Sequence, residues 1–151
     1  MKNDIPNRLI LRNEQETSDL AFKIGKDLRK GELITLDGDL GTGKTFFTGA
    51  LCTALGIERK NISSPTYVIM RKIEGIFTVY HWDFYRINSE DELFTADFFE
   101  CLKDRNAINI VEWASLFRKS WTEHTPRIEI KIEFGDTDDE RRIEIKRTDP
   151  C

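Results

Sequence analysis

Residues 38–45 read Gly38-Asp39-Leu40-Gly41-Thr42-Gly43-Lys44-Thr45, a glycine-rich segment that ends in a Lys-Thr pair. Its outer glycines and the Lys-Thr pair stand at the spacing of a P-loop, which binds phosphate groups. The segment before it, 33–36, is short and apolar, as in a buried parallel strand. After it, apolar residues recur at helical spacing from Phe46 until Gly56. A strand, a glycine-rich loop and a helix in this order predict a phosphate-binding site.

The chemistry of this loop follows from its glycines and from the helix behind it. Glycines let consecutive backbone N–H groups approach a phosphate closely, and the helix N-terminus adds roughly +0.5 e of partial charge. Lys44 can reach the β- and γ-phosphates of a nucleotide, and the Thr45 hydroxyl can ligate Mg²⁺. We expect the nucleotide contacts to come from one continuous run: Asp39, Leu40, Gly41, Thr42, Gly43, Lys44, Thr45 and Phe46.

Glu112 is the first candidate for the carboxylate that completes the metal site of a P-loop protein. It follows residues 108–111, an apolar run that predicts a central strand, so its side chain should emerge at the carboxyl edge of the sheet. Ligands bind at that edge in open α/β sheets, and an acid there can hold Mg²⁺ directly or through water. We expect Thr45 and Glu112 to ligate the metal. For Glu112 taken alone, a solvated acid at the end of a strand is the alternative interpretation.

Asp83 is the second candidate, within the segment 81–86, which reads His-Trp-Asp-Phe-Tyr-Arg. In an extended chain His81, Asp83 and Tyr85 share one face, and the two aromatic residues between them share the other. An amphipathic strand would explain the aromatic residues as core, but the segment is denser in functional groups than a core strand needs. We expect Asp83 and Glu112 to be the catalytic acids. The sequence leaves open which of them is linked to the metal.

Two further helices are predicted from capping patterns. Asn13 is a suitable N-cap with Glu16 three residues later, and apolar residues then recur at helical spacing until Gly31, which should end the helix. Ser89 and Glu92 form a second such pattern. The apolar residues after them predict one helix that continues to about residue 103.

Two hairpins complete the expected fold. Segments 68–73 and 76–80 predict strands joined by a tight turn at Glu74-Gly75. In 128–134 and 143–145, isoleucines alternate with charged residues, as in half-solvated antiparallel strands. We expect an α/β fold, with a mostly parallel central sheet, flanking helices and antiparallel hairpin additions, in a single P-loop NTPase-like domain over 1–151. The ends, 1–7 and 148–151, are expected to fray.

Composition narrows the class of protein. A chain of 151 residues with 39% apolar residues can bury one sizeable core, and its formal charge of −4 argues against a nucleic-acid-binding protein that acts alone. The three cysteines are widely spaced without a CxxC pair, which argues against a zinc site. The sequence has no signal-like start and no apolar run approaching roughly 18 residues, so we expect it to work in the cytoplasm.

Four motifs follow one another in an order that points to a known family. The loop 38–45, the segment Ser64-Pro65-Thr66-Tyr67, the segment 81–86 and Val111-Glu112-Trp113 together resemble the signatures of the bacterial TsaE family, also called YjeE. The likeness covers the chain from about Asn13 to the C-terminal hairpin. Each motif other than the loop is weak alone, whereas the ordered set is specific.

The resemblance implies a small ATPase, with ATP and Mg²⁺ as cofactors, that is required for making threonylcarbamoyladenosine (t6A) in tRNA. In that family the protein joins a TsaB–TsaD assembly, in which TsaD carries the transfer chemistry and the ATPase supports turnover. Contact with tRNA would be indirect, through that complex. Lys44 and Thr45 would bind phosphates and Mg²⁺. Thr66 would lie in the segment that senses the nucleotide, and Trp113 would lie near the nucleotide.

The chain departs from the family's pattern at two positions. Phe46 stands where the family usually has a second Thr that can touch the α-phosphate, and losing one such hydrogen bond costs typically ~1 kcal/mol. Asp97 stands near a position that is usually glycine. No arginine finger is recognisable, and Arg71 and Arg86 are the only basic residues near the motifs that could serve. We therefore expect the isolated protein to hydrolyse ATP slowly and its partners to alter the rate.

Two other classes of protein share the loop. A small kinase or free-standing nucleotide switch is the main alternative, but a kinase usually needs a basic lid, and no arginine-rich insertion resembles one. A binding module could instead use ATP only to fix its shape. Transfer of phosphate to a small molecule would favour the kinase, and hydrolysis retained after Glu112→Ala would contradict the catalytic assignment.

Overall fold

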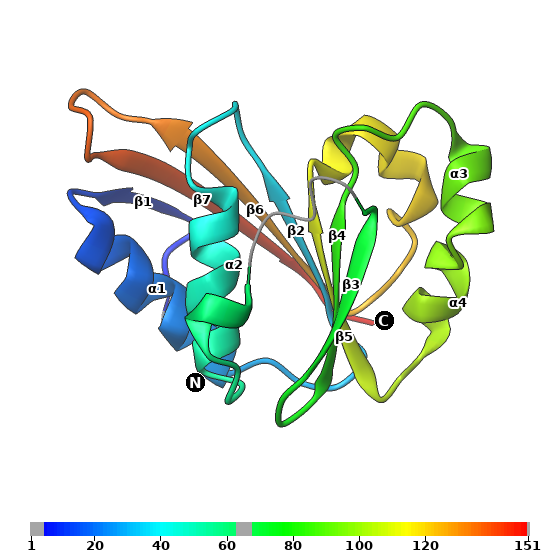
Figure 1. The fold of residues 1–151 in the computed structure, drawn as a ribbon. Helices are drawn as coiled ribbons and strands as arrows, with labels where there is room; N and C mark the ends of the chain where they lie inside the picture. Colours follow the sequence, from blue (N-terminus) through cyan, green and yellow to red (C-terminus); the bar gives the residue numbers. More distant parts are fainter. Residues whose placement is uncertain (1–4, 63–67, 151) are drawn as a thin grey trace.

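The computed structural model describes residues 5–62 and 68–150, and within them seven strands form one mixed sheet (Figure 1). The strands are β1 (Arg8–Leu11), β2 (Leu33–Asp37), β3 (Met70–Glu74), β4 (Thr78–Asp83), β5 (Ala107–Glu112), β6 (Arg127–Phe134) and β7 (Arg141–Thr148). Their order across the sheet is β1-β7-β6-β2-β5-β4-β3.

The four central strands run parallel. β2 pairs in parallel with β5 and β6, and β5 pairs in parallel with β4, whereas β7, β1 and β3 join in antiparallel pairs. Leu36 and Asp83 both pair with Glu112, so the carboxyl ends of β2, β4 and β5 meet at one edge of the sheet. This arrangement confirms the predicted α/β fold with a parallel centre and antiparallel hairpins.

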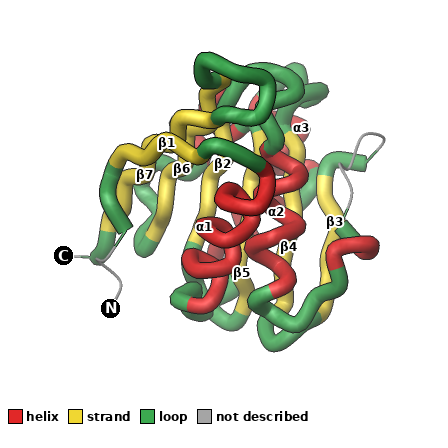
Figure 2. Tube along the Cα trace, turned by 90° about the vertical axis from the view of Figure 1, so that its left-hand side faces the viewer, coloured by secondary structure: helices red, strands yellow, loops and turns green. Residues whose placement is uncertain are grey.

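Helices cover both faces of the sheet. They are α1 (Glu14–Lys26), α2 (Lys44–Thr53), α3 (Glu90–Thr95) and α4 (Phe98–Lys103), with two short 3₁₀ helices, η1 (Arg59–Asn61) and η2 (Ala114–Ser120). α1 and α2 lie side by side in front of the sheet in Figure 2 and bury a mainly aliphatic cluster. α3, α4 and η2 lie on the other side (Figure 1), around a second cluster rich in aromatic residues: Trp82, Phe84, Phe98 and Trp121.

α1 begins where its capping pattern predicts. The Asn13 side chain accepts a hydrogen bond from the Glu16 N–H at 2.8 Å, and the Glu16 carboxylate accepts one from the Arg12 N–H at 2.8 Å. The helix ends at Lys26, earlier than expected. Gly31 therefore does not cap it; its φ of 89° lies in the connection to β2, and its N–H donates to the Ala107 carbonyl.

The single helix expected from Ser89 to about residue 103 is wrong. Ser89 and Glu92 do form a capping box, but the segment is two helices, α3 and α4, separated at Asp97, whose φ is 64° and ψ is 28°. Leu93 and Phe98 would lie about 140° apart on one continuous helix, yet both are fully buried in the aromatic cluster. Burying such side chains is worth about 1.5–3 kcal/mol each, which exceeds the cost of roughly 1–2 kcal/mol for a left-handed residue.

The first hairpin differs from its prediction in its turn and in the ends of its strands. β3 begins at Met70, and its connection to β4 spans residues 75–77, so the tight turn placed at Glu74-Gly75 is wrong. β4 then runs three residues beyond the expected end at Tyr80, to Asp83. The hydrogen bond from the Ile76 N–H to the Leu55 carbonyl, at 2.7 Å, ties this longer connection to the end of α2.

The sheet differs from the prediction near both chain ends. β1 was not predicted; its short segment contains Arg8 and gains its partners only by pairing with β7. β7 continues to Thr148, and Arg147 pairs with Ile128, so the strand includes the first position that was expected to fray.

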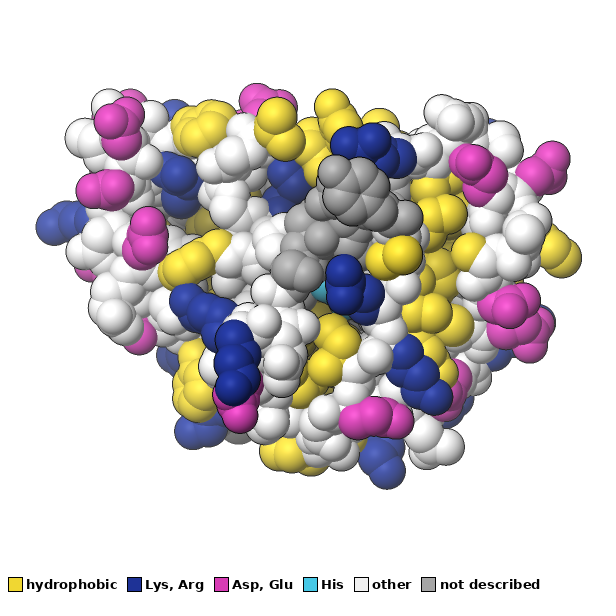
Figure 3. Space-filling model, viewed as in Figure 1, with side chains coloured by type: hydrophobic (Ala, Val, Ile, Leu, Met, Phe, Trp, Pro, Cys, Tyr) yellow, Lys and Arg dark blue, Asp and Glu magenta, His cyan; other side chains and the backbone are white. Residues whose placement is uncertain are grey.

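The surface shows no extended region of one charge on the face drawn in Figure 3, where acidic and basic side chains are interspersed. Among the helices of residues 5–62 and 68–150, none is both long and apolar enough to cross a membrane.

Candidate nucleotide-binding site

The glycine-rich loop connects the end of β2 to the first residue of α2, as predicted. Gly41 and Gly43 have φ values of 83° and 106°, in the left-handed region that glycine adopts without strain. A Cβ at Gly38 would lie 2.3 Å from the Ile132 carbonyl oxygen, so only glycine fits there. The Thr42 hydroxyl donates to the Asp39 carbonyl at 2.8 Å and closes the turn. The loop therefore stands at the carboxyl edge of the sheet, before a helix N-terminus.

Lys44 lies folded over this loop. Its Nζ donates to the carbonyl oxygens of Gly38 (2.8 Å) and Asp39 (3.0 Å) and lies 4.0 Å from the centroid of the Trp113 ring. Burial lowers the pKa of Lys44, and nearby carboxylates, Glu112 first among them, oppose that shift. The loop thus holds a cation within a largely enclosed site.

Glu112 is the best-fixed acid of the site, with 2% of its surface exposed at the end of β5. Its Oε1 accepts a hydrogen bond from the Thr45 hydroxyl at 2.9 Å. Its Oε2 lies 2.5 Å from Nε2 of His81 and 3.4 Å from the Thr48 hydroxyl. The P-loop threonine and the acid at the end of the neighbouring strand, both predicted as metal ligands, therefore lie within hydrogen-bond distance of each other.

His81 is a member of this network that sequence reasoning placed near Asp83 but gave no role. It is fully buried, and its Nδ1 has no hydrogen-bond partner among the described residues. Parallel pairing sets Asp83 beside Glu112, and His81 lies two residues before Asp83 on the same face of β4. The available signal was the His-x-Asp spacing, but only the register between β4 and β5 shows that the histidine reaches Glu112.

Asp83 stands at the same edge as Glu112, as predicted. Its Oδ1 accepts a hydrogen bond from the Tyr85 N–H at 2.9 Å, which turns the chain out of β4. The extended arrangement considered for Tyr85 is wrong, because β4 ends at Asp83; the Tyr85 ring instead packs on Trp113 with 4.7 Å between centroids. Trp113 itself is left-handed, with φ 59°, and its N–H donates to the Leu36 carbonyl.

These groups surround a cavity of about 360 Å³ between the loop and the ends of β4 and β5. It is lined by Leu40, Gly41, Gly43, Lys44, Thr45, Phe46, Asp83, Tyr85, Arg86, Glu112 and Trp113. Asp39 does not line it and shapes the loop through its carbonyl group; Thr42 lines a smaller cavity on the other side of the loop. Thr66 lies outside the described residues, and Arg71 lies on β3 away from the lining.

The oxygen donors of this cavity fit Mg²⁺. The Thr45 hydroxyl is hydrogen-bonded to the Glu112 carboxylate, and Asp83 pairs with Glu112 in the register of β4 and β5. These three side chains offer oxygen ligands, the kind that magnesium prefers. Within residues 5–62 and 68–150, no three His, Cys, Asp or Glu side chains are grouped to hold a metal by themselves. Magnesium commonly takes only one or two protein carboxylates and completes its shell with phosphates and water.

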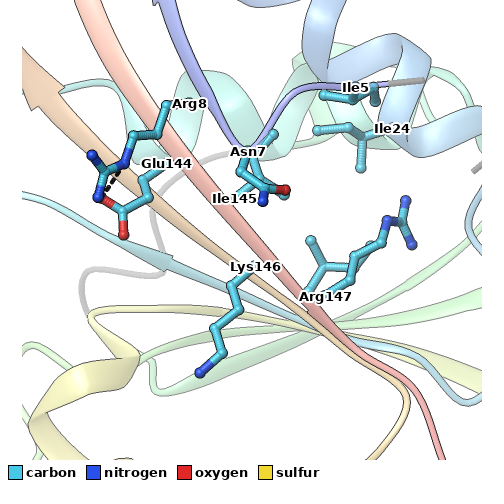
Figure 4. A pocket seen from close by; sticks show the side chains of 9 residues that line it. Ile5, Asn7, Arg8, Ile24, Glu144, Ile145, Lys146 and Arg147 are labelled. Atoms are coloured by element: carbon cyan, nitrogen blue, oxygen red, sulfur yellow. Dashed lines mark ion pairs between the residues drawn. The ribbon is translucent and has the colours of Figure 1, made fainter. Parts of the chain in front are cut away.

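A separate cavity of about 480 Å³ lies toward the amino ends of β2 and β6, beside Ile24, Ile128 and Ile145 (Figure 4). At its edge Arg8 and Glu144 form an ion pair at 3.9 Å. The lining contains neither a glycine-rich loop nor a helix N-terminus, and it stands at the opposite end of the parallel strands from Lys44. This cavity is not part of the phosphate-binding site.

Comparisons with known proteins show what the chain is similar to. The family model described as "Threonylcarbamoyl adenosine biosynthesis protein TsaE" matches residues 11–143. The tRNA threonylcarbamoyladenosine biosynthesis protein TsaE of Rickettsia felis is 36% identical over 129 residues, which cover 85% of this chain and 73% of that protein. The Bacillus subtilis protein of the same name is 36% identical over 133 residues, covering 87% and 79%.

A solved structure shares the fold. The crystal structure of Bacillus subtilis YdiB superposes with a TM-score of 0.67 at 29% identity, over 91% of this chain and 82% of that one. The family-model match, residues 11–143, includes the P-loop, both acids and the central strands.

Proposed function

Because the chain belongs to the TsaE family of threonylcarbamoyladenosine biosynthesis proteins, we propose that it binds ATP with Mg²⁺ beside the P-loop and hydrolyses it slowly in support of t6A formation. The membership confirms the resemblance inferred from the ordered motifs. The observation that carries the hydrolytic part is the Glu112 carboxylate, held between the Thr45 hydroxyl and His81 at the edge of the phosphate cradle.

The loop's residues would divide the work of binding. Backbone N–H groups of the loop and of the start of α2 would surround the phosphates, and the helix N-terminus behind them favours negative charge. Lys44 would exchange its two carbonyl partners for phosphate oxygens, since a charged acceptor binds an ammonium more strongly than a neutral one. Thr45 and Glu112 would hold Mg²⁺, which when bound offsets charge on the phosphates.

The acids would prepare the attacking water. Asp83 and Glu112 lie side by side at the ends of β4 and β5, so one can serve the metal while the other orients or deprotonates water. Besides Lys44, the basic residue Arg86 also lines the cavity and could approach the phosphates. A second chain that supplied a further cation would raise the rate, because such a finger is worth about 10³–10⁵ in comparable reactions.

The partner we propose is a TsaB–TsaD complex, with tRNA reached through it. The rim of the cavity presents side chains that a partner can cover: Leu40 is 73% exposed and Tyr85 is 52% exposed. A protein that docked there would close the nucleotide off from water and could place its own charges beside the phosphates. This gives a physical reason for a rate that depends on assembly.

The test is ATP hydrolysis and t6A formation in a reconstituted system with TsaB, TsaD and tRNA, with and without this chain. We expect slow hydrolysis by the isolated chain, a changed rate with partners, and t6A turnover that needs both ATP and the chain. Turnover by the isolated chain at a typical kinase rate, about 1–100 s⁻¹, would contradict the proposal. Phosphate transfer to a small-molecule acceptor would favour the kinase instead.

Glu112→Gln tests the catalytic assignment within that system. We expect hydrolysis to fall about 100-fold or more, and ATP affinity to change by less than about 3-fold, because the amide keeps the shape but not the charge. Glu100→Gln is the matched control, since Glu100 is an exposed acid on α4. Unchanged hydrolysis in Glu112→Gln would remove Glu112 from the mechanism.

A further inference from the structure

The P-loop separates two cavities of different character. The first contains Lys44, Asp83 and Glu112, whereas the second, of about 180 Å³, lies against the start of α1 and the β6–β7 connection. In Figure 1 the loop rises from the upper end of β2, with the β6–β7 connection on one side and the ends of β4 and β5 on the other. Phe46 lines both cavities, as do Gly41 and Gly43.

The charges decide which end of a nucleotide belongs in each cavity. Lys44 points toward Trp113 and is electrostatically coupled to Glu112, so the terminal phosphates and their metal belong on that side. The second cavity carries Glu14 and Asp139, which repel phosphate. Its one basic residue, Arg141, is already bonded to the carbonyl groups of Thr42, Asp138 and Glu140. The nucleoside end is therefore the end that fits the second cavity.

The Phe46 ring lies between the two cavities and is packed against Arg59. The Arg59 guanidinium lies 4.5 Å from the ring centroid. Arg59 is in turn held by a hydrogen bond to the Ser18 hydroxyl at 3.0 Å and packs closely on Gly49, where an added Cβ would lie 3.2 Å from its Cγ. A ring supported by a cation on one side and lining a cavity is suited to stacking, since every nucleobase has a π-face.

We propose that Phe46 is the stacking platform for the nucleobase of the bound nucleoside triphosphate, with the base in the cavity beside Thr17, Thr42 and Asp139. This inference rests on the proposed function, because it places the nucleobase of the same ATP molecule whose phosphates would bind the P-loop. The carboxylates of Glu14 and Asp139 favour a base that carries an exocyclic amino group, which can donate to them. Stacking on Phe46 would add to the affinity that the phosphate contacts of the loop supply.

The test compares ATP with inorganic tripolyphosphate, which has the phosphates but no base. Dissociation constants of both, with Mg²⁺, are measured by calorimetry for the wild type, Phe46→Thr, Phe46→Leu and Phe46→Tyr. We expect Phe46→Leu, which keeps apolar volume without a π-face, to weaken ATP about 10-fold and to leave tripolyphosphate unchanged. Phe46→Thr should lose the same stacking but bind tripolyphosphate more tightly, because its hydroxyl can donate to a phosphate oxygen. Phe46→Tyr should match the wild type.

Phe22→Leu is the matched control, because Phe22 is a half-exposed ring on α1 that also has a cation, Lys26, near its face. Unchanged or tighter ATP binding in Phe46→Leu, or equal weakening of both ligands, would overturn the platform. If the wild type binds both ligands and Phe46→Leu has no effect, only this inference fails. If the wild type binds neither ligand, the proposed function itself fails.

Discussion

The two sides of the P-loop are built from different kinds of contact. Toward β4 and β5, side chains bond to one another: Thr45 and His81 both reach Glu112, and Lys44 lies against Trp113. Toward the β6–β7 connection, the contacts to the loop are made through its backbone, and Arg141 donates to the Thr42 carbonyl at 2.9 Å. One side positions charges, and the other fixes the shape of the loop.

This difference should allow the rate of hydrolysis to be changed separately from the affinity for the nucleotide. Groups that bond to Glu112 should control the rate of hydrolysis, because they fix the direction of a carboxylate near the reacting phosphate. Groups that hold the loop backbone should control affinity, because they fix the N–H groups that surround the phosphates. Substitutions on the two sides should therefore change different parameters.

Lys44→Ala has the largest expected effect. Lys44 belongs to both sides of the loop, because it bonds to the loop backbone and also lies against Trp113. Hydrogen bonds to charged groups are worth about 1.5–3 kcal/mol each, and Lys44 would make at least two to phosphates. We expect ATP and tripolyphosphate to bind at least about 100-fold more weakly, measured by calorimetry. Lys26→Ala, at an exposed position of α1, is the control. Affinity retained within 3-fold, roughly 0.7 kcal/mol, would mean that the phosphates do not lie on this loop.

His81→Phe sharpens the comparison on the acidic side. The ring keeps the volume of the buried site but leaves Glu112 Oε2 without its closest partner. We expect the hydrolysis rate to fall about 10-fold with little change in ATP affinity, and unfolding in urea to become easier by about 1–3 kcal/mol. His81→Gln, whose amide nitrogen can approach Glu112, should recover much of the rate. Equal losses of rate in both variants would show that only packing matters at this position.

Arg141→Ala tests the other side. Removing the hydrogen bond to the Thr42 carbonyl should loosen the loop at a cost of about 1 kcal/mol, so ATP and tripolyphosphate should both bind about 5-fold more weakly. The rate at saturating ATP should stay near that of the wild type. Arg142→Ala is the matched control, because the neighbouring arginine pairs with Asp136 at the surface. A fall in the hydrolysis rate without a fall in affinity would contradict the assignment of affinity to this side of the loop and of rate to the other.

Much of this site could be predicted because its signals are local. The P-loop, the cap at Asn13 and the acid at the end of β5 each depend on residues close together in sequence, so spacing and periodicity are sufficient to predict them. The bond between His81 and Glu112 joins residues 31 positions apart. It depends on the parallel register of β4 and β5, which no local pattern specifies.

The failures in the fold have the same cause. β1 exists because β7 offers it a partner, and its four residues carry no strand pattern of their own. The apolar spacing of α3 and α4 is compatible with one continuous helix. The break at Asp97 is set by the aromatic cluster, which buries Leu93 and Phe98 together. Tertiary packing therefore outweighed local propensity at these places.

Asp97 gives the smallest expected effect and lies on neither side of the loop. Its φ of 64° is unfavourable for alanine, so Asp97→Ala should lower the free energy of unfolding by about 1 kcal/mol, measured by urea denaturation. Glycine has no Cβ and adopts this conformation freely, so Asp97→Gly should stay within about 0.5 kcal/mol of the wild type. Neither variant should change ATP affinity or hydrolysis. An effect of Asp97→Gly on the rate, with stability preserved, would extend the catalytic side of the loop to the α3–α4 break.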